Sequence, residues 1–212
     1  MRSRFPDPRL APPDAPLAWG GDLEPDTLLD AYRHGIFPWP SGDTLWWWSP
    51  DPRAVFDLDA GLHISRSLRR TLRRGHLHAR VDTAFAEVVD ACAHRPGEGT
   101  WITPALRDAY VRLHDLGFAH SVEVVDDDGR LVGGVYGVAL GGAFMGESMF
   151  HRVTDASKVA LVHLVAHLRE RGFTLFDAQL PTPHLASLGA RSIPRAAFLD
   201  ALDEAVALPR RF

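Results

Sequence analysis

The sequence predicts an α/β (α+β) chain, with a small N-terminal domain over residues 1–53 and a larger sheet-containing domain over residues 54–212. Residues 1–53 hold five of the six tryptophans and many of the prolines. The rest of the chain alternates helical and strand patterns more regularly. A length of 212 residues is also enough for one large domain with a small partner.

The composition is that of a soluble globular protein. Hydrophobic residues make up 46% and charged residues 24%, and no apolar stretch approaches the roughly 20 residues of a membrane span. The first residues, MRSRFPDPRL, lack the apolar core of a signal peptide, and the single cysteine cannot form an internal disulfide. We therefore expect a cytoplasmic protein. We take it to be a monomer, although nothing in the sequence sets the oligomeric state. Because the net charge is −4, any nucleic acid must be bound by a local basic patch.

In the N-terminal domain we predict one helix from Pro25 to His34. Pro25 suits a first helical turn and Gly35 a helix end. The segment that follows, GIFPWPSGDTLWWWSPDPRAV, is rich in turn residues and tryptophan. We expect it to be irregular and to pack on the faces of its tryptophans.

Three helices are predicted next. Ser65 can cap a helix that Gly75 closes. Asp82 can cap a second, whose apolar residues recur on one side at helical spacing. The pair Thr103-Pro104 begins a third, which stops at Gly117.

A run of strands and one long helix complete the pattern. Residues 121–125, 131–138 and 143–150 indicate an antiparallel meander. A helix capped by Thr154 or Asp155 follows, and then a strand over residues 173–180. Because a strand–helix–strand connection is a crossover, we expect the last strand to lie parallel to the 143–150 strand. This element order is that of the acetyltransferase-like fold.

Polar residues on two of these strands are candidates for chemistry. Asp177 and Gln179 are two residues apart and face the same side of their strand. Glu147 shares a predicted face with Met145 and Met149. If the two strands are neighbours, these three polar side chains converge on one site. The alternative is that Asp177 and Glu147 bind loop amides or form an internal ion pair.

A basic cluster lies on the helix that Ser65 caps. Its arginines repeat at i, i+4 spacing and repel one another by a few tenths of a kcal/mol per pair, which favours an anionic partner such as RNA phosphate. A solvated basic face is the alternative. The cluster comprises Arg66, Arg69, Arg70, Arg73 and Arg74.

Aromatic and metal-binding signals are weaker. Trp39 and Trp101 lie beside proline or glycine breaks and could line an apolar pocket or stack on a base, although core filling is the commoner role of a tryptophan. His163 and His167 are spaced i, i+4 but lack the glutamate of a zinc-protease motif. Cys92 falls on the apolar side of its helix. We predict no metal site.

The chain resembles the leucyl/phenylalanyl-tRNA–protein transferases over most of its length. Long ordered strings carry this resemblance and are more specific than any short motif. They are GGDLEPDTLLDAYRHGIFPW, WWSPDPRAV, LHISRSLRR, GTWITPAL, LHDLGFAHSVEV, LVGGVYGVALGGAFMGESMF, DASKVAL and HLASLGARSIPR.

The resemblance implies a reaction without cofactor or metal. The ester of Leu-tRNA or Phe-tRNA is attacked by the α-amine of an acceptor protein that begins with Arg or Lys. The acceptor then becomes a substrate for regulated proteolysis of the N-degron type. Such enzymes pair an acetyltransferase-like C-terminal domain with a small N-terminal one.

The resemblance also assigns residues. Asp177 and Gln179 become the catalytic pair, Glu147 a substrate-binding residue, and Trp39 and Trp101 the site for the 3′-terminal adenosine. The five arginines are our candidates for the tRNA-binding surface on the strength of their charge and spacing rather than of the resemblance. The donor side chain is implied to enter a pocket formed by Met149, Leu161, Leu164, Leu168 and Phe176.

Two departures from the family pattern stand out: Pro40 replaces an aromatic residue after Trp39, and Ala178 replaces a cysteine. Two rival functions remain. An acyl-CoA-dependent N-acetyltransferase would need a glycine-containing loop before the long helix, where this chain has HRVTDASKVA. A non-catalytic RNA-binding module would explain the arginines but not the inward polar residues.

Overall fold

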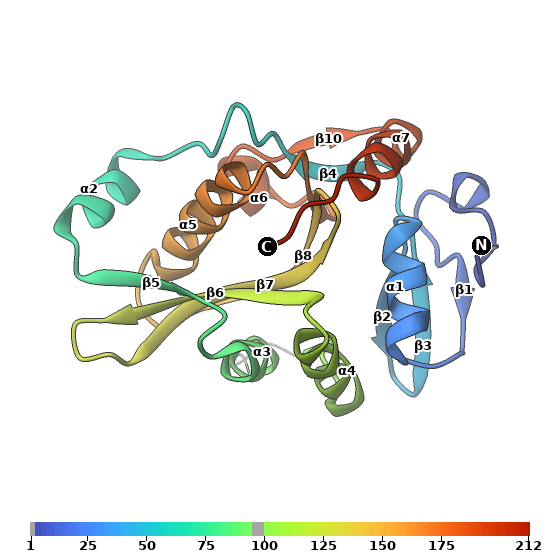
Figure 1. Cartoon of the computed structure of the whole chain (residues 1–212), viewed down its shortest axis with the longest axis horizontal. Helices are drawn as coiled ribbons and strands as arrows, with labels where there is room; N and C mark the ends of the chain where they lie inside the picture. The colour runs from blue at the N-terminus through green and yellow to red at the C-terminus, as the bar shows by residue number, and fades with distance from the viewer. Residues whose placement is uncertain (1–2, 95–99) are drawn as a thin grey trace.

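The structure, a computed structural model, describes residues 3–94 and 100–212. Residues 1 and 2 of the predicted N-terminal domain, and Gly99 of the string GTWITPAL, lie outside the described residues. The described chain contains two sheets and the helices that cover them (Figure 1).

A three-stranded antiparallel sheet lies in the first part of the chain, where we expected irregular structure. Its strand order is β1-β3-β2. The strands form because Gly42, with φ of 57°, supplies the turn that joins β2 and β3. Pro40 is accommodated because β2 is an edge strand. The elements of this part are the 3-10 helix Pro8–Leu10, β1 (Ala18–Trp19), α1 (Pro25–Arg33), β2 (Phe37–Ser41) and β3 (Thr44–Trp48).

The larger sheet has seven strands in the order β10-β4-β9-β8-β7-β6-β5. The predicted antiparallel meander is confirmed in β6, β7 and β8, and β9 is parallel to β8 as expected. The strands are β4 (Arg53–Phe56), β5 (Leu77–Val81), β6 (Ala119–Asp126), β7 (Leu131–Leu140), β8 (Ala143–His151), β9 (Leu175–Gln179) and β10 (Arg191–Ile193).

Helices cover both faces of this sheet. The long helix α5 packs on one face, and α3 and α4 pack on the other beside α1 (Figure 1). Each face has its own apolar core, with Phe144 and Leu164 in one and Tyr110 and Phe198 in the other. The helices are α2 (Arg66–Arg74), α3 (Phe85–Ala93), α4 (Pro104–Asp115), α5 (Ala156–Glu170), α6 (Pro183–Ser187) and α7 (Arg195–Val206).

Two of the four predicted helix caps are confirmed. The hydroxyl of Ser65 accepts a hydrogen bond from the backbone N–H of Leu68, and that of Thr103 accepts one from Leu106. Gly75 ends α2 in the left-handed conformation, as predicted.

Of the other two predicted caps, Asp82 is wrong, and Asp155 is confirmed in position but not as a side-chain cap. Helix α3 begins at Phe85, and Asp82, with φ of 54°, directs its carboxylate to the backbone N–H of Ser121 instead. Asp155 occupies the position before α5, but its side chain makes no capping bond. It accepts from Thr71 and Lys158, because a hydroxyl and an ammonium lie within its reach.

β8 and β9 each contain a β-bulge, and each bulge bends its strand. Adjacent residues of β7, Tyr136 and Gly137, pair with Ser148 and Gly146, so Glu147 is the extra residue. The bulge requires glycine in β7, since a Cβ at Gly137 would lie 2.2 Å from the Met145 carbonyl oxygen. In β9 the extra residue is Ala178.

The bulge in β8 overturns one expectation about its faces. Met145 packs in the core on the α3–α4 side, whereas Met149 packs against the core on the α5 side. Strict alternation would have placed both on the face of Glu147, but the extra residue shifts the alternation by one.

Within the residues described, no helix is both long enough and apolar enough to cross a membrane.

Candidate active site

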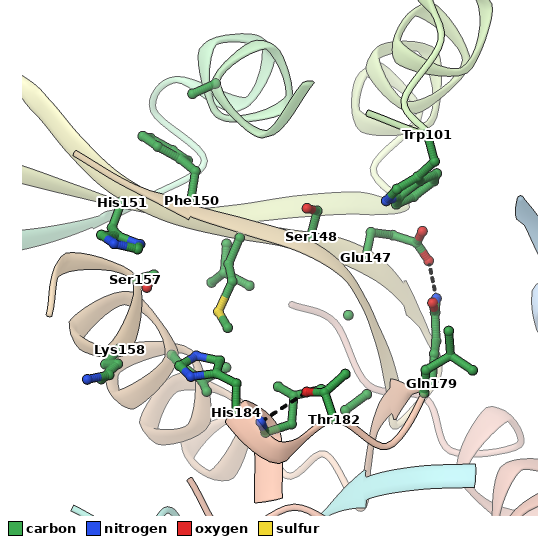
Figure 2. Close-up of a pocket in the computed structure, with 18 of the residues that line it drawn as sticks. Trp101, Glu147, Ser148, Phe150, His151, Ser157, Lys158, Gln179, Thr182 and His184 are labelled. Carbon is green, nitrogen blue, oxygen red and sulfur yellow. Dashed lines mark hydrogen bonds between the residues drawn. The ribbon is translucent and has the colours of Figure 1, made fainter. Parts of the chain in front are cut away.

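A cavity of about 1350 Å³ opens where β8 and β9 stop pairing. Their last paired residues are Met145 and Asp177, and the cavity is lined by residues that follow directly in both strands. Figure 2 shows Trp101, Glu147 and Gln179 gathered at one end, with Lys158 and the imidazoles of His151 and His184 at the other. The cavity thus joins a hydrogen-bonded polar centre to a region that carries basic side chains.

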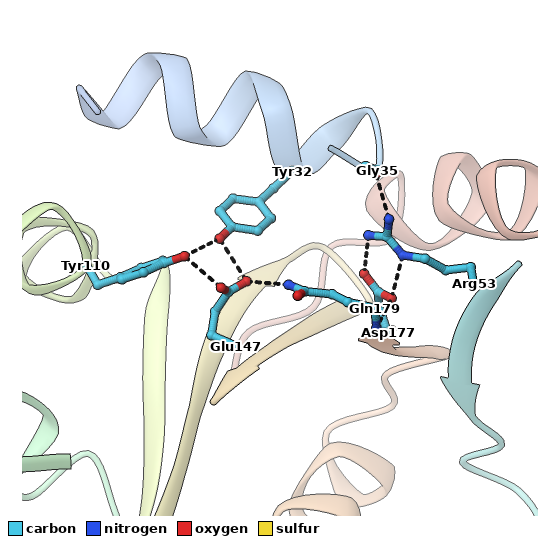
Figure 3. Close-up of polar contacts among 7 residues, drawn as sticks. All are labelled: Tyr32, Gly35, Arg53, Tyr110, Glu147, Asp177 and Gln179. Atoms are coloured by element: carbon cyan, nitrogen blue, oxygen red, sulfur yellow. Dashed lines mark hydrogen bonds and ion pairs between the residues drawn. The ribbon is translucent and has the colours of Figure 1, made fainter. Parts of the chain in front are cut away.

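Glu147 is the centre of the polar end (Figure 3). Its Oε1 accepts hydrogen bonds from the Tyr32 hydroxyl at 2.8 Å and from Gln179 Nε2 at 2.7 Å. Its Oε2 accepts one from the Tyr110 hydroxyl at 2.7 Å. The two tyrosines come from α1 and α4, so the site joins the N-terminal part of the chain to the larger sheet.

Three oxygen–oxygen contacts in this group are short enough to be hydrogen bonds, and each of them needs a proton. Besides their bonds to Glu147, the hydroxyls of Tyr32 and Tyr110 lie 2.7 Å from each other. Two phenols bring two protons, and an ionised carboxylate brings none. A proton on Glu147 supplies the third. One tyrosine then accepts from the carboxyl group and donates to the other tyrosine, which donates to the second carboxyl oxygen.

The electrostatics of the site agree with that proton count. Burial raises the pKa of Glu147 to about 7, and the negative charge of Asp177 acts in the same direction against the hydrogen bonds from Tyr110, Tyr32 and Gln179. Burial and the charge of Glu147 raise the pKa of both tyrosines well above their usual range. Glu147 is therefore the group of this cluster that exchanges a proton near neutral pH.

Asp177 lies behind the cavity and is completely buried. Its two oxygens bind Arg53 Nε at 2.8 Å and Nη2 at 2.7 Å, and Oδ1 also accepts the backbone N–H of Gln179 at 2.8 Å. Arg53 donates a further bond to the Gly35 carbonyl, and its guanidinium lies over the rings of Phe37 and Phe198. The internal ion pair that we considered as an alternative for Asp177 is therefore present.

Gln179 lines the cavity and connects the two buried groups. Its side chain binds Glu147 and its backbone binds Asp177. Its φ of 62° is rare for a residue with a side chain, and it follows the bulge at Ala178. Because its amide nitrogen faces a carboxylate, its Oε1 is left without a donor among the described residues.

Arg53, Tyr32 and Tyr110 were not singled out in the sequence. The signal for Arg53 was its position in the strand RAV, where a cation in an apolar run needs a buried partner. For the tyrosines no local signal existed, because their hydroxyls reach Glu147 from helices distant in sequence.

Trp39 and Trp101 stack on each other at the edge of the cavity. Their ring centroids are 5.1 Å apart and their planes differ by 16°. Both line the cavity and both are half-buried. An aromatic surface thus lies beside the polar centre.

The predicted apolar pocket is brought together only in part. Met149, Leu161 and Phe176 line the cavity. Leu164 and Leu168 do not, because they are fully buried in the core between α5 and the sheet. They lie beneath the pocket rather than in its wall.

The arginine cluster lies on the exposed face of α2. Leu68 packs that helix into the core, and Thr71 bonds Asp155 at the start of α5, which borders the cavity. No carboxylate in the described part of the chain pairs with any of the five arginines. They are Arg66, Arg69, Arg70, Arg73 and Arg74, all exposed.

Two family profiles match this chain, and both describe the same family. A family profile described as "Leucyl/phenylalanyl-tRNA protein transferase" matches residues 55–203. The profile of that family's N-terminal domain matches residues 21–51.

Individual relatives cover nearly the whole chain. The leucyl/phenylalanyl-tRNA–protein transferase of Aromatoleum aromaticum is 59% identical over 93% of this chain and 84% of its own. That of Stutzerimonas stutzeri is 59% identical over 91% and 86%. That of Anaeromyxobacter sp. strain K is 56% identical over 97% and 89%. The structure of L-PGS from Bacillus licheniformis is similar at a TM-score of 0.43 and 16% identity, over 77% of this chain and 55% of that one, too distant to bear on the site.

Proposed function

The chain belongs to the leucyl/phenylalanyl-tRNA protein transferase family, and we propose on that premise that it transfers Leu or Phe from aminoacyl-tRNA to the N-terminal Arg or Lys of acceptor proteins. The single observation that supports this site is the hydrogen bond between Glu147 and Gln179, which both line the cavity where β8 and β9 stop pairing. It places a proton-exchanging group and an amide acceptor in one cavity. The modified acceptor then enters regulated proteolysis.

The donor binds along the cavity. The terminal adenosine stacks on the indoles of Trp39 and Trp101, since base–aromatic stacking contributes roughly 1–3 kcal/mol per base. The esterified side chain enters the apolar wall formed by Met149, Leu161 and Phe176. Selection there rests on size and on the absence of polar partners for a hydrophilic side chain.

The chemistry needs an amine that has lost a proton. The acceptor nitrogen attacks the ester carbonyl carbon, the C–N bond forms, and the bond to the 3′-oxygen of the ribose breaks. Oε1 of Gln179 accepts a hydrogen bond from the amine and orients it. Ionised Glu147 stabilises, through the Gln179 amide, the positive charge that develops on the attacking nitrogen. The ammonium releases one proton to solvent before attack, and the second proton, lost from nitrogen as the amide forms, passes to the ribose oxygen as it leaves.

Asp177 supports this step without meeting the substrate. The bond from the Gln179 backbone to its carboxylate holds the residue at its unusual φ. Arg53 in turn fixes the carboxylate at two points. Within the proposed catalytic pair, Gln179 contacts the amine and Asp177 is the positioning residue.

The five arginines of α2 contact the tRNA backbone. They are exposed and pair with no carboxylate of residues 3–94 and 100–212, so five charges are available for phosphate. They lie next to the helix start that borders the cavity. Because charged tRNA is the donor, the reaction takes place in the cytoplasm. The protein acts as a monomer, and each chain carries a complete site. The ester is already activated, so the reaction needs no acyl-CoA, nucleotide or metal.

A transfer assay tests the proposal. The protein is incubated with labelled Leu-tRNA and a polypeptide that begins with Arg, and the product is identified by the mass of its N-terminal fragment. Matched acceptors begin with Met or with N-acetylated Arg, and a parallel reaction replaces Leu-tRNA with labelled acetyl-CoA. Leucine on the free Arg terminus alone supports the proposal, whereas acetyl transfer, or no transfer, contradicts it.

A further inference from the structure

A carboxylate and two imidazoles meet at a place apart from the cavity. Asp82 follows β5, His114 lies in the last turn of α4, and His120 lies near the start of β6. One nitrogen or oxygen atom from each lies within 4.8 Å of those of the other two. None of the three belongs to the cavity lining described above. Because they are scattered in sequence, no spacing motif marks them.

The surroundings of His114 fix its tautomer. Its Nδ1 lies 2.8 Å from the Ala119 carbonyl oxygen, which can only accept a hydrogen bond. Nδ1 therefore carries the proton, and Nε2 has a free lone pair. The ring stacks on Phe85 with centroids 4.3 Å apart and planes 2° from parallel. Metal-binding histidines are typically held in this way: the nitrogen that does not bind the metal, here Nδ1, donates to a backbone carbonyl.

His120 faces acceptors on both sides of its ring. Its Nδ1 lies 2.7 Å from Asp82 Oδ2, and its Nε2 lies 3.2 Å from the Gly117 carbonyl oxygen. A neutral imidazole has one proton and can satisfy only one of them. Either a second proton or a metal cation between Nδ1 and the carboxylate resolves the conflict.

We propose that Asp82, His114 and His120 form a binding site for a divalent transition-metal cation, Zn²⁺ being the best fit. Two imidazole nitrogens and one carboxylate oxygen are a common zinc donor set, and water completes the tetrahedron. A cation near the three atoms uses the lone pairs of both histidines and neutralises the carboxylate. Zinc bonds of about 2.0–2.2 Å require the three atoms to adjust by roughly an ångström.

The second oxygen of Asp82 anchors the site. Oδ1 accepts the backbone N–H of Ser121 at 2.8 Å, which leaves Oδ2 for the metal. Side-chain exposures of 28% for Asp82 and 13% for His120 leave a route from solvent. The bound cation would join the end of β5, the end of α4 and the start of β6. It would stabilise the fold and take no part in the transfer reaction.

Metal binding to the full chain tests the proposal. Chelator-treated protein is titrated with Zn²⁺ by calorimetry, and with Co²⁺ by visible absorption, which reports coordination geometry. One Zn²⁺ per chain, a tetrahedral Co²⁺ spectrum and a higher melting temperature with Zn²⁺ are expected, since a ligand of the folded state stabilises it.

Two variants locate the metal. Asp82→Asn removes the charge at a position with φ of 54°, which Asn tolerates, and His114→Phe preserves the ring stack. Each should weaken Zn²⁺ binding at least tenfold. His78→Gln is the matched control, because His78 also pairs with a carboxylate, Asp127, but has no third ligand within the described chain.

Unchanged Zn²⁺ affinity in both variants, or no binding by the unaltered protein, overturns the proposal. Circular dichroism confirms that each variant is folded. If a variant is not folded, the Co²⁺ spectrum of the unaltered protein decides the question, and an octahedral spectrum counts against the site.

Discussion

Arg53 and Asp177 form a two-point ion pair in the core, with nitrogen–oxygen distances of 2.8 and 2.7 Å and side-chain exposures of 1% and 0%. The pair joins β4 to β9 directly behind the cavity. Because both charges are sealed from water, each depends on the other. A substitution of Asp177 therefore changes the stability of the fold as well as the rate of transfer.

Asp177→Asn should lower the free energy of unfolding by about 3–5 kcal/mol, since it leaves the Arg53 guanidinium buried and unpaired. Urea denaturation measures the loss. The double variant Arg53→Met/Asp177→Leu removes both charges and should recover much of that stability, yet remain slow in transfer because Gln179 has lost its backbone anchor. Equal urea midpoints for Asp177→Asn and wild type would show that the pair contributes nothing.

Glu147 should make the stability of the fold depend on pH. Its pKa is about 7 in the folded chain and near 4.5 in the unfolded chain, so the folded chain holds an extra proton between these values. The stability that this group contributes is therefore complete below about pH 4.5 and is lost as the pH rises through 7. Relative to wild type, Glu147→Gln should gain up to about 3 kcal/mol between pH 4.5 and 7.5.

Urea midpoints of both proteins across this range provide the measurement. A constant difference between Glu147→Gln and wild type at every pH would mean that Glu147 titrates in the folded chain as it does in the unfolded one.

Leu161 and Leu164 offer a matched pair of positions for testing the proposed donor pocket. Leu161→Trp extends into the cavity and should reduce use of Phe-tRNA relative to Leu-tRNA by about tenfold or more. Leu164→Trp overpacks the core and should cost roughly 1–3 kcal/mol of stability without changing the donor ratio of the folded enzyme. Competition between the two charged tRNAs, together with a thermal melt, separates the effects. A changed ratio in Leu164→Trp alone would place the pocket elsewhere.

The basic face of α2 predicts a salt effect. Arg69→Ala/Arg73→Ala should weaken tRNA binding and reduce the slope of log K against log salt by about 2, one unit for each lost phosphate contact. Filter binding at several salt concentrations gives the slope. Arg130→Ala, at the exposed turn between β6 and β7, serves as control and should leave it unchanged. An identical slope in both variants would remove α2 from the tRNA-binding surface.

Sequence patterns were sufficient for the elements that follow regular periodicity. The meander, the parallel strand and the caps at Ser65 and Thr103 are local or follow from strand order. The small sheet was missed because prolines in β2 hide a strand whose hairpin turn depends on Gly42. The cap predicted at Asp82 is wrong because a distant backbone amide, that of Ser121, binds its carboxylate instead.

In the candidate site, too, some features could be predicted from the sequence and others could not. Glu147, Asp177 and Gln179 were predicted to converge because neighbouring strands place their polar residues together, and hydrogen bonds join all three. Their different environments could not be predicted, because β-bulges are not visible in a hydrophobic pattern. The partner of Asp177, the buried Arg53, comes from a strand more than a hundred residues away.

Gln179 tests the central claim most directly. The measurement is the single-turnover rate of leucine transfer from a preformed complex with Leu-tRNA to a saturating Arg-terminated acceptor. Gln179→Ala removes the amide, and Gln179→Asn retains it but shortens its reach at a backbone position that Asn tolerates. Both variants should transfer about a hundredfold more slowly, within the usual range for a lost acid–base contact, with Leu-tRNA affinity nearly unchanged. Transfer by Gln179→Ala at close to the wild-type rate would contradict the account.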